Sequence, residues 1–231
     1  VWIKRVFQTS ELFLSYFQTH RTELNETVNF RYMSLFIEIG EISESLFGDC
    51  EFIFAEIVLL FSSNDVLVKL GSLSLIESLS QYKSGQEYLA KSEIASILES
   101  ELTTDSSDSI EIMLTMANIL AFVEKANTIL NGKKFLPILK KFIISSNPLE
   151  RICAMKVLAK LSVDRFAAFL KANWKLFDEV VFAITDFTDI EIVNTAIDTV
   201  CQAVKNWDGN LFLETESSQV GLVNQLVASF K

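Results

Sequence analysis

NPLERICAMKVLAKL, residues 147–161, is the stretch of sequence that decides the fold. Asn147 is a favourable N-cap, because its side-chain oxygen accepts hydrogen bonds from unpaired N–H groups of a first helical turn. Pro148 then takes the first helical position, where its missing N–H costs nothing. Met155, Leu158 and Leu161 follow at steps of three, which places them on one side of a helix. The segment therefore predicts a capped helix with one apolar side.

The same pattern occurs four more times, and its starts are 40, 43, 39 and 42 residues apart. The five capping residues are Asn25, Asp65, Asp108, Asn147 and Asp189. Further apolar helical stretches lie between the copies, at 50–61, 94–102, 135–144, 174–184 and 220–230. Short extra helices are expected at 84–92 and 165–171. A helix pair that repeats at about 41 residues is typical of HEAT and armadillo proteins. We therefore expect an all-α, right-handed α-solenoid that forms one domain over residues 1–231.

Three columns of apolar residues are expected to form the core of this solenoid. Eight residues after the cap stand Met33, Leu73, Met116, Met155 and Ile197. Eleven residues after it stand Phe36, Ile76, Ile119, Leu158 and Val200. Fourteen residues after it stand Ile39, Leu79, Phe122, Leu161 and Ala203. The column at seven, which suits close helix approach because it is mostly small, holds Tyr32, Ser72, Thr115, Ala154 and Ala196.

Composition agrees with a helical interior and narrows the class of protein. Hydrophobic residues make up 50% of the chain, but there are only 7 glycines and 2 prolines, too few for the tight turns of a β-sandwich or barrel. A mean hydropathy of +0.32 with 19 phenylalanines excludes disorder. No apolar run approaches the ~18 residues of a membrane-spanning helix, so no membrane partner is expected. Because the chain begins with Val1, we expect it to be part of a longer solenoid.

Charge and cysteine usage bear on partners and location. The net charge of −10 repels a phosphate backbone, which argues against nucleic acid as a partner. Cys50, Cys153 and Cys201 are an odd number and lie in apolar helical patterns, which favours reduced, buried thiols. The cysteines therefore favour an intracellular location, and we expect the protein in the cytoplasm and also in the nucleus.

Residues that could carry chemistry are scarce. The one histidine, His20, follows an apolar stretch and is better explained as a cation at a helix end than as a catalytic base. Glu38, Glu41 and Glu44 are spaced as a solvated helix face. No metal-binding or phosphate-binding motif is present. We expect neither enzymatic activity nor a cofactor.

Solenoids usually bind partners through one helix of each repeat. Opposite the core columns lie the positions six, nine and thirteen after each cap, here called the outward ladder; Gly71, Cys153 and Thr195 belong to it. Its candidate partner-binding residues are Arg31, Ser34, Glu38, Ser74, Ser78, Leu114, Ala117, Ala121, Lys156, Lys160, Asp198 and Gln202. Lys156 and Lys160 make a basic spot on an acidic chain, which suits a carboxylate or a C-terminal tail of a partner. Ordinary solvent-facing lysines remain the alternative.

Several strings resemble the family of the 26S proteasome non-ATPase regulatory subunit 5. They are VNFRY at 28–32, FIEI at 36–39, ESL at 44–46, NDVLVK at 64–69 and GQEYL at 85–89, with Ile94 and Ile97. The likeness continues through 148–161 and 196–200, whereas residues 103–134 depart from the pattern. The resemblance implies a chaperone for assembly of the proteasome regulatory particle. Such a protein binds the C-terminal domain of a base ATPase subunit, keeps the immature base from docking onto the core particle, and leaves before the proteasome is complete.

Two other kinds of armadillo-type protein compete with this interpretation. Nuclear import receptors present a regular array of Trp and Asn on their groove helices. Trp2, Trp174 and Trp207 lie outside the outward ladder, and Asn118 and Asn194 occupy different repeat positions, so the sequence argues against import-signal binding. A scaffold subunit of a phosphatase or a microtubule complex stays open, because the repeat period is compatible with it.

Overall fold

A computed structural model describes residues 12, 14–20, 23–42, 51–103, 108–124, 126–185 and 189–206. Within these ranges the regular structure is helical and no residue is in a strand. Successive helices pack on their neighbours in series, which confirms the predicted α-solenoid. The contacts divide the chain into two compact units, Val1–Leu89 and Ala90–Lys231, which are described separately below.

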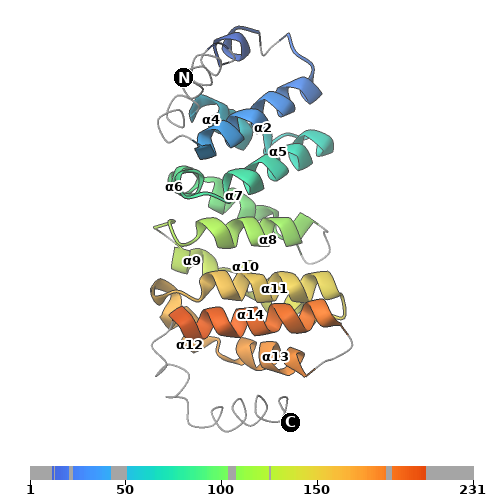
Figure 1. Cartoon of the computed structure of the whole chain (residues 1–231), viewed down its shortest axis with the longest axis vertical. Helices are drawn as coiled ribbons and strands as arrows, with labels where there is room; N and C mark the ends of the chain where they lie inside the picture. The colour runs from blue at the N-terminus through green and yellow to red at the C-terminus, as the bar shows by residue number, and fades with distance from the viewer. Residues whose placement is uncertain are drawn as a thin grey trace. The chain divides into compact units, whose positions relative to one another are not determined.

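The first unit contains α2 (Glu26–Ile42), α4 (Glu51–Leu60), α5 (Val66–Leu79) and most of α6 (Lys83–Lys91) (Figure 1). Helices α2, α4 and α5 all contact one another. Gly85 allows α6 to begin close under the end of α5, since a Cβ there would lie 2.9 Å from the carbonyl carbon of Leu79. The short helix expected at 84–92 is therefore confirmed, and a glycine makes its position possible.

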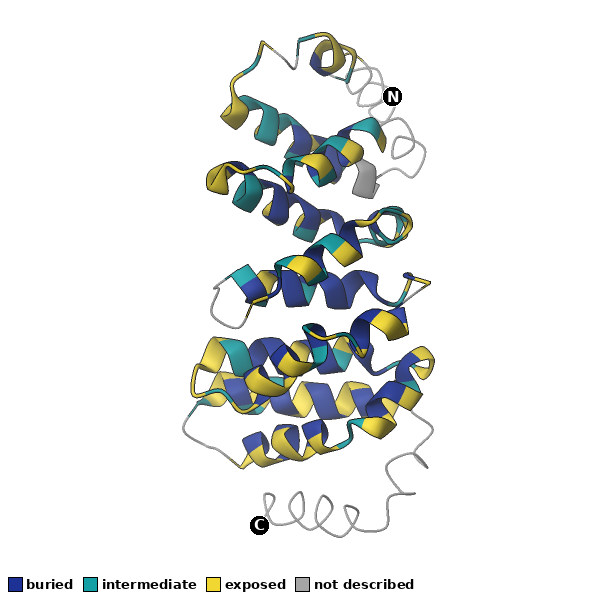
Figure 2. Cartoon of the chain, turned by 180° about the vertical axis from the view of Figure 1, so that it is seen from behind, coloured by how far each residue is buried: buried dark blue, intermediate teal, exposed yellow. Residues whose placement is uncertain are grey.

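The second unit consists of helix pairs and short helices. Its elements are α7 (Ile94–Glu101), α8 (Asp108–Ile119), α9 (Ala126–Leu130), α10 (Phe135–Ile143), α11 (Pro148–Leu161), the 3-10 helix η1 (Asp164–Phe166), α12 (Ala167–Ala172), α13 (Lys175–Ile184) and α14 (Ile190–Asn206). The capped helices α8, α11 and α14 lie side by side in one layer (Figure 1). Helices α7, α10 and α13 pack respectively against α8, α11 and α14. The buried residues gather where these helices face one another (Figure 2).

Four of the five predicted caps are confirmed by hydrogen bonds. Asp65 accepts from the N–H groups of residues 67 and 68, and Asn147 accepts from that of residue 149. Asp189 accepts from residues 191 and 192, and Asn25 accepts from residue 28. The prediction for Asp108 is wrong, because α8 already includes this residue in its first turn.

The predicted core columns are buried with three exceptions. All five residues that stand eleven positions after a cap are buried. In the column of mostly small residues at seven positions after the cap, Ser72, Thr115, Ala154 and Ala196 are buried as well. Phe122 is 37% exposed because α8 ends at Ile119, so a helical offset no longer applies three residues further on. Ile197 is 38% exposed and continues the exposed apolar stripe of Ile190 and Val204 along α14. Ile39 is half-buried.

Side-chain donors join neighbouring repeats at main-chain carbonyl groups. In the first unit, Tyr82 donates its hydroxyl to the carbonyl oxygen of residue 37 at 3.2 Å, and Tyr88 to that of residue 51 at 3.3 Å. In the second unit, Thr199 of α14 donates to the carbonyl oxygen of Met155 in α11 at 3.1 Å. Arg165 donates to the carbonyl groups of residues 121, 123 and 124, just beyond the end of α8. Each donor lies about one repeat after its acceptor.

Most elements lie where the sequence predicts them. The apolar stretches at 50–61, 94–102, 135–144 and 174–184 become α4, α7, α10 and α13, and the short stretch at 165–171 becomes η1 and α12. Helix α9 is a third short helix that the repeat pattern does not predict, and it ends in a turn at Asn131 and Gly132. The expected helix at 220–230 lies outside the described residues.

Candidate protein-binding surface

The outward ladder of the first unit is polar and accessible. On α2, Arg31 and Glu38 are exposed and Ser34 is half-buried. On α5, Ser74 and Ser78 are exposed, and the hydroxyl of Ser78 donates to the carbonyl oxygen of residue 74 at 3.0 Å. These residues lie on helices that contact each other, so the structure brings them onto neighbouring elements of this unit.

The ladder of the second unit is accessible on two of its three helices. Lys156 and Lys160 of α11 are exposed, as are Asp198 and Gln202 of α14. Helices α11 and α14 have extensive contact with each other, which places the two exposed pairs on adjacent elements. Leu114 and Ala121, from α8 and the turn that follows it, are only half-buried.

Ala117 is a correction to the predicted surface, because its side chain is 3% exposed. Cys153, which belongs to the ladder because it stands six residues after Asn147, is buried as well. Its Sγ lies 3.6 Å from the carbonyl oxygen of Ile110 in α8. The run from Thr115 to Leu120 is buried on all sides of the helix. Such a helix is surrounded by packing and has no free face for a partner. At Ala117 the ladder therefore lies in the interior, whereas Leu114 and Ala121 are half-buried.

The two lysines of α11 affect one another electrostatically. Partial burial lowers the pKa of the Lys160 ammonium, and the positive charge of Lys156 lowers it further. A carboxylate placed between the two ammonium groups relieves this repulsion and favours the charged form of Lys160. Lys156 and Lys160 thus form a local concentration of positive charge on α11.

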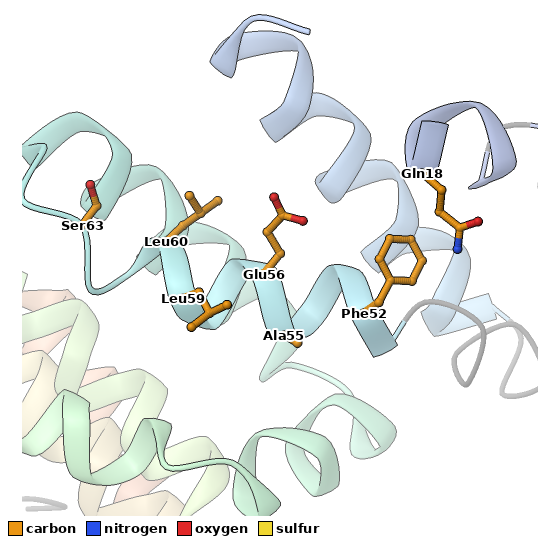
Figure 3. Close-up of a pocket in the computed structure, with 7 residues that line it drawn as sticks. All are labelled: Gln18, Phe52, Ala55, Glu56, Leu59, Leu60 and Ser63. Atoms are coloured by element: carbon orange, nitrogen blue, oxygen red, sulfur yellow. The ribbon is translucent and has the colours of Figure 1, made fainter. Parts of the chain in front are cut away.

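An open groove of about 670 Å³ runs along the outer face of α4 in the first unit (Figure 3). Phe52, Ala55, Leu59 and Leu60 supply its apolar wall. Leu59 is 72% exposed, whereas Glu56 supplies the one carboxylate among the residues that line the groove. Sequence reasoning missed this surface because it followed the capped helices only. The signal is present in EFIFAEIVLL, whose apolar residues continue around the helix.

The histidine and the cysteines do not form part of a chemical site among the described residues. His20 lies at the end of a helical segment, where Nδ1 is 3.1 Å from the Glu23 carboxylate and the ring lies 4.5 Å from that of Tyr16. Cys153 is buried as predicted, but Cys201 is exposed on α14, and Cys50 lies outside the described residues. No three His, Cys, Asp or Glu side chains of the described ranges gather as metal ligands. Among the helices described, none has the length and hydropathy to cross a membrane.

Stacked helix pairs with an exposed polar face define this chain as an α-solenoid. A family model described as proteasome non-ATPase 26S subunit matches residues 6–163, more than half of the chain. The chain belongs to this family, and its role is therefore related to the proteasome. It is also similar to the crystal structure of an engineered protein, at 16% identity and a TM-score of 0.60 over 95% of each chain, which shows the fold alone. No curated protein matches the chain.

Proposed function

We propose that this protein is a non-catalytic chaperone for assembly of the 26S proteasome regulatory particle base. The observation that carries the proposal is the family match over residues 6–163. The matched region contains the strings that resemble the subunit 5 family, among them NDVLVK at 64–69 and GQEYL at 85–89. Within the proteasome non-ATPase subunits, we therefore assign the chain to that family.

The proposed partner is the C-terminal domain of a base ATPase subunit, which contacts exposed residues of the outward ladder. Arg31 and Glu38 in the first unit, and Lys156, Lys160 and Asp198 in the second, supply charged contacts of both signs. Complementary charge favours encounter and orientation of a partner more than it adds affinity. The surface therefore selects its partner by shape and charge pattern, without a chemical step or a cofactor.

In this proposal, the protein acts as a chaperone because it occupies a surface of the ATPase domain. A protein bound to the ATPase domain covers the surface that would otherwise contact the core particle, so the immature base is held back from docking. Release must accompany completion of the particle, because a mature contact and the chaperone compete for one surface. The proposed location is the cytoplasm, and also the nucleus.

The test is capture of purified base ATPase C-terminal domains by the chain carrying both Lys156→Glu and Lys160→Glu. We expect the wild type to capture one of these domains and the double variant to capture about tenfold less, because two reversed charges now repel carboxylates of the partner. Both sites are exposed, so the free energy of unfolding should change by less than about 0.5 kcal/mol per site.

The matched control is the pair Lys140→Glu and Lys175→Glu, which changes net charge equally but lies on α10 and α13. Equal loss of capture by both pairs would mean that net charge, not the α11 surface, governs binding. Undiminished capture by a folded Lys156/Lys160 variant removes these lysines from the site. If the wild type captures no ATPase domain, the proposed function is wrong. The protein is then better explained as another armadillo-type adaptor or scaffold.

A further inference from the structure

One side of α14 carries large aliphatic side chains that are open to solvent. Ile190, Ile197 and Val204 are 79%, 38% and 52% exposed, and each stands seven residues from the next. Seven residues are close to two helical turns, so the three side chains form one row, here called the α14 stripe. Val193, which is half-buried, and Cys201, which is exposed, adjoin this row. Apolar side chains in such a row gain free energy when another surface covers them.

The α14 stripe points away from α11. Thr199 donates its hydroxyl to the carbonyl oxygen of Met155, so the side of α14 that carries Thr199 faces α11. Ile197 stands two positions before Thr199, which is a rotation of about 200° around an α-helix. The two side chains therefore leave the helix on nearly opposite sides, and the stripe lies on the far side of α14 from α11.

The same side of the two preceding capped helices is covered by the next helix of the layer. At the repeat position of Ile197 stand Met116 of α8 and Met155 of α11, and both are fully buried. Helix α8 packs against α11, and α11 packs in turn against α14. The α14 stripe thus repeats the surface that joins the capped helices within this unit. Another amphipathic helix is the element that fits it.

The charges beside the stripe suit a second copy of α14 that runs in the opposite direction. When Ile197 is placed opposite its own copy, Ile190 lies opposite Val204 of the second copy, because 190 and 204 are equally far from 197. Glu191 and Lys205 are both exposed and lie on one flank of the stripe, so each carboxylate comes close to the ammonium group of the other copy. A parallel arrangement offers no such pair, because each residue then lies at the height of its own copy.

One charge opposes this antiparallel arrangement. Asp198 is exposed on the same flank and lies near the two-fold axis, so it approaches its own copy. The interface therefore contains two attractive pairs of Glu191 with Lys205 and one repulsive pair of aspartates. Removing the aspartate charge should strengthen the association, which gives the arrangement a signature that an unspecific apolar contact does not have.

We propose that the protein forms a two-fold dimer in which the α14 stripes of two copies pack against each other in opposite directions. A contact of one helix from each copy lies at the low end of interface sizes, so the dissociation constant should be about 10–100 μM. The proposal does not rest on the proposed function, because Ile190, Ile197 and Val204 are not residues of the outward ladder.

Sedimentation equilibrium of the intact chain, at about 5–500 μM, measures the association. We expect a monomer at the lowest concentration and a dimer at the highest. Ile197→Ser should weaken the dimer by at least about tenfold, because the change removes apolar contact from both copies. Leu149→Ser is the matched control, since Leu149 is exposed on α11 in the same unit. It should leave the dissociation constant within about twofold. A melting curve for each variant shows that it is folded.

Charge reversal tests the direction of the two helices. Lys205→Glu and Glu191→Lys should each weaken the dimer by about fivefold, and the two changes together should restore it to within about twofold of the wild type. Asp198→Asn should strengthen the dimer. Loss of affinity in both single variants without recovery in the double variant contradicts the antiparallel pairing.

Cysteine cross-linking tests the position of the two-fold axis. In a chain with Cys50→Ser and Cys201→Ser, Ile197→Cys should form a disulfide between copies under mild oxidation, because the two side chains meet at the axis. Gln202→Cys is the control on the same helix. Its two copies are about 15 Å apart along the helix axis, which is too far for a disulfide.

Three outcomes overturn the inference: a monomer at every concentration, equal weakening by Leu149→Ser and Ile197→Ser, or equal cross-linking of the two introduced cysteines. The proposal is also wrong if the chain stays monomeric while Ile197→Ser reduces capture of ATPase domains, because the stripe then binds a different partner. Dimer formation is measured on this chain alone, so a failure of the proposed function leaves the test unaffected.

Discussion

At the scale of single residues, the two described cysteines show how packing decides reactivity. Cys153 and Cys201 both lie on capped helices, yet one is buried and the other is exposed. Burial raises the pKa of the Cys153 thiol to about 12; Lys156 opposes the shift and Glu150 reinforces it. The thiolate is the reactive form, so Cys153 is inert at neutral pH.

We predict that iodoacetamide modifies Cys201 and spares Cys153 in the native protein at pH 8. Peptide mapping by mass spectrometry measures both sites, and denatured protein, in which both react, is the control. Because the folded pKa of Cys153 lies above its unfolded value of 9.0, its thiol contributes stability below pH 9 that is lost as pH rises from about 9 to 12. Equal native labelling of the two cysteines would contradict the buried position.

The site residues were only partly predictable at this scale. Lys156, Lys160, Asp198 and Gln202 are exposed as the helical period indicates. The prediction that Ala117 is exposed is wrong. It depended on periodicity alone, because alanine occurs both in interiors and on surfaces. The long-range donor Arg165 was also missed, since its acceptors lie more than 40 residues earlier and main-chain carbonyls leave no trace in the sequence.

At the scale of elements, caps and apolar period predicted most helices because both signals are local. Asp65 and Asn147 accept the hydrogen bonds expected of N-caps. The residue that stands eleven positions after each cap is buried in every repeat. Helix α9 was missed because its five residues are too few to show a helical period. Phe122 was misassigned because the alignment continued a fixed offset beyond the end of α8.

The approach of α6 to α5 gives a prediction at the same scale. Gly85→Ala should destabilise the protein by about 1–3 kcal/mol, because the new methyl group meets the main chain at Leu79, which cannot move aside. Chemical denaturation measures the loss. Gly71→Ala is the control: its Cβ would lie 3.1 Å from the Phe30 ring, a side chain that can shift, and alanine favours the helix by about 1 kcal/mol. A larger loss for Gly71→Ala would show that the close contact at α6 is wrongly placed.

At the scale of the whole molecule, stability should follow repeat neighbours. Leu158 is fully buried in α11, between α8 and α14, so Leu158→Ala should cost about 2–5 kcal/mol. Because solenoid repeats couple to adjacent repeats, amide hydrogen exchange should accelerate first in α8, α11 and α14. Helices α2 and α5, in the other compact unit, should change least.

Leu149→Ala is the control for this prediction, because Leu149 is 63% exposed on the same helix and its loss should cost less than about 0.5 kcal/mol. Uniform acceleration of exchange over both units would show that the chain unfolds as one cooperative body. Similar losses for the two leucines would place the core on the wrong side of α11.

The hydrogen bonds between repeats have a consequence for how such a chain changes over generations. Tyr82, Arg165 and Thr199 each donate to carbonyl oxygens one repeat earlier, and every residue type has a carbonyl oxygen. Mutation of an acceptor residue therefore leaves the bond in place as long as the backbone there keeps its conformation. Only the donor position is restricted, so each repeat is free to drift in sequence while the next still holds it in register. Within each unit, repeats with little identity can in this way keep the same contact with their neighbours.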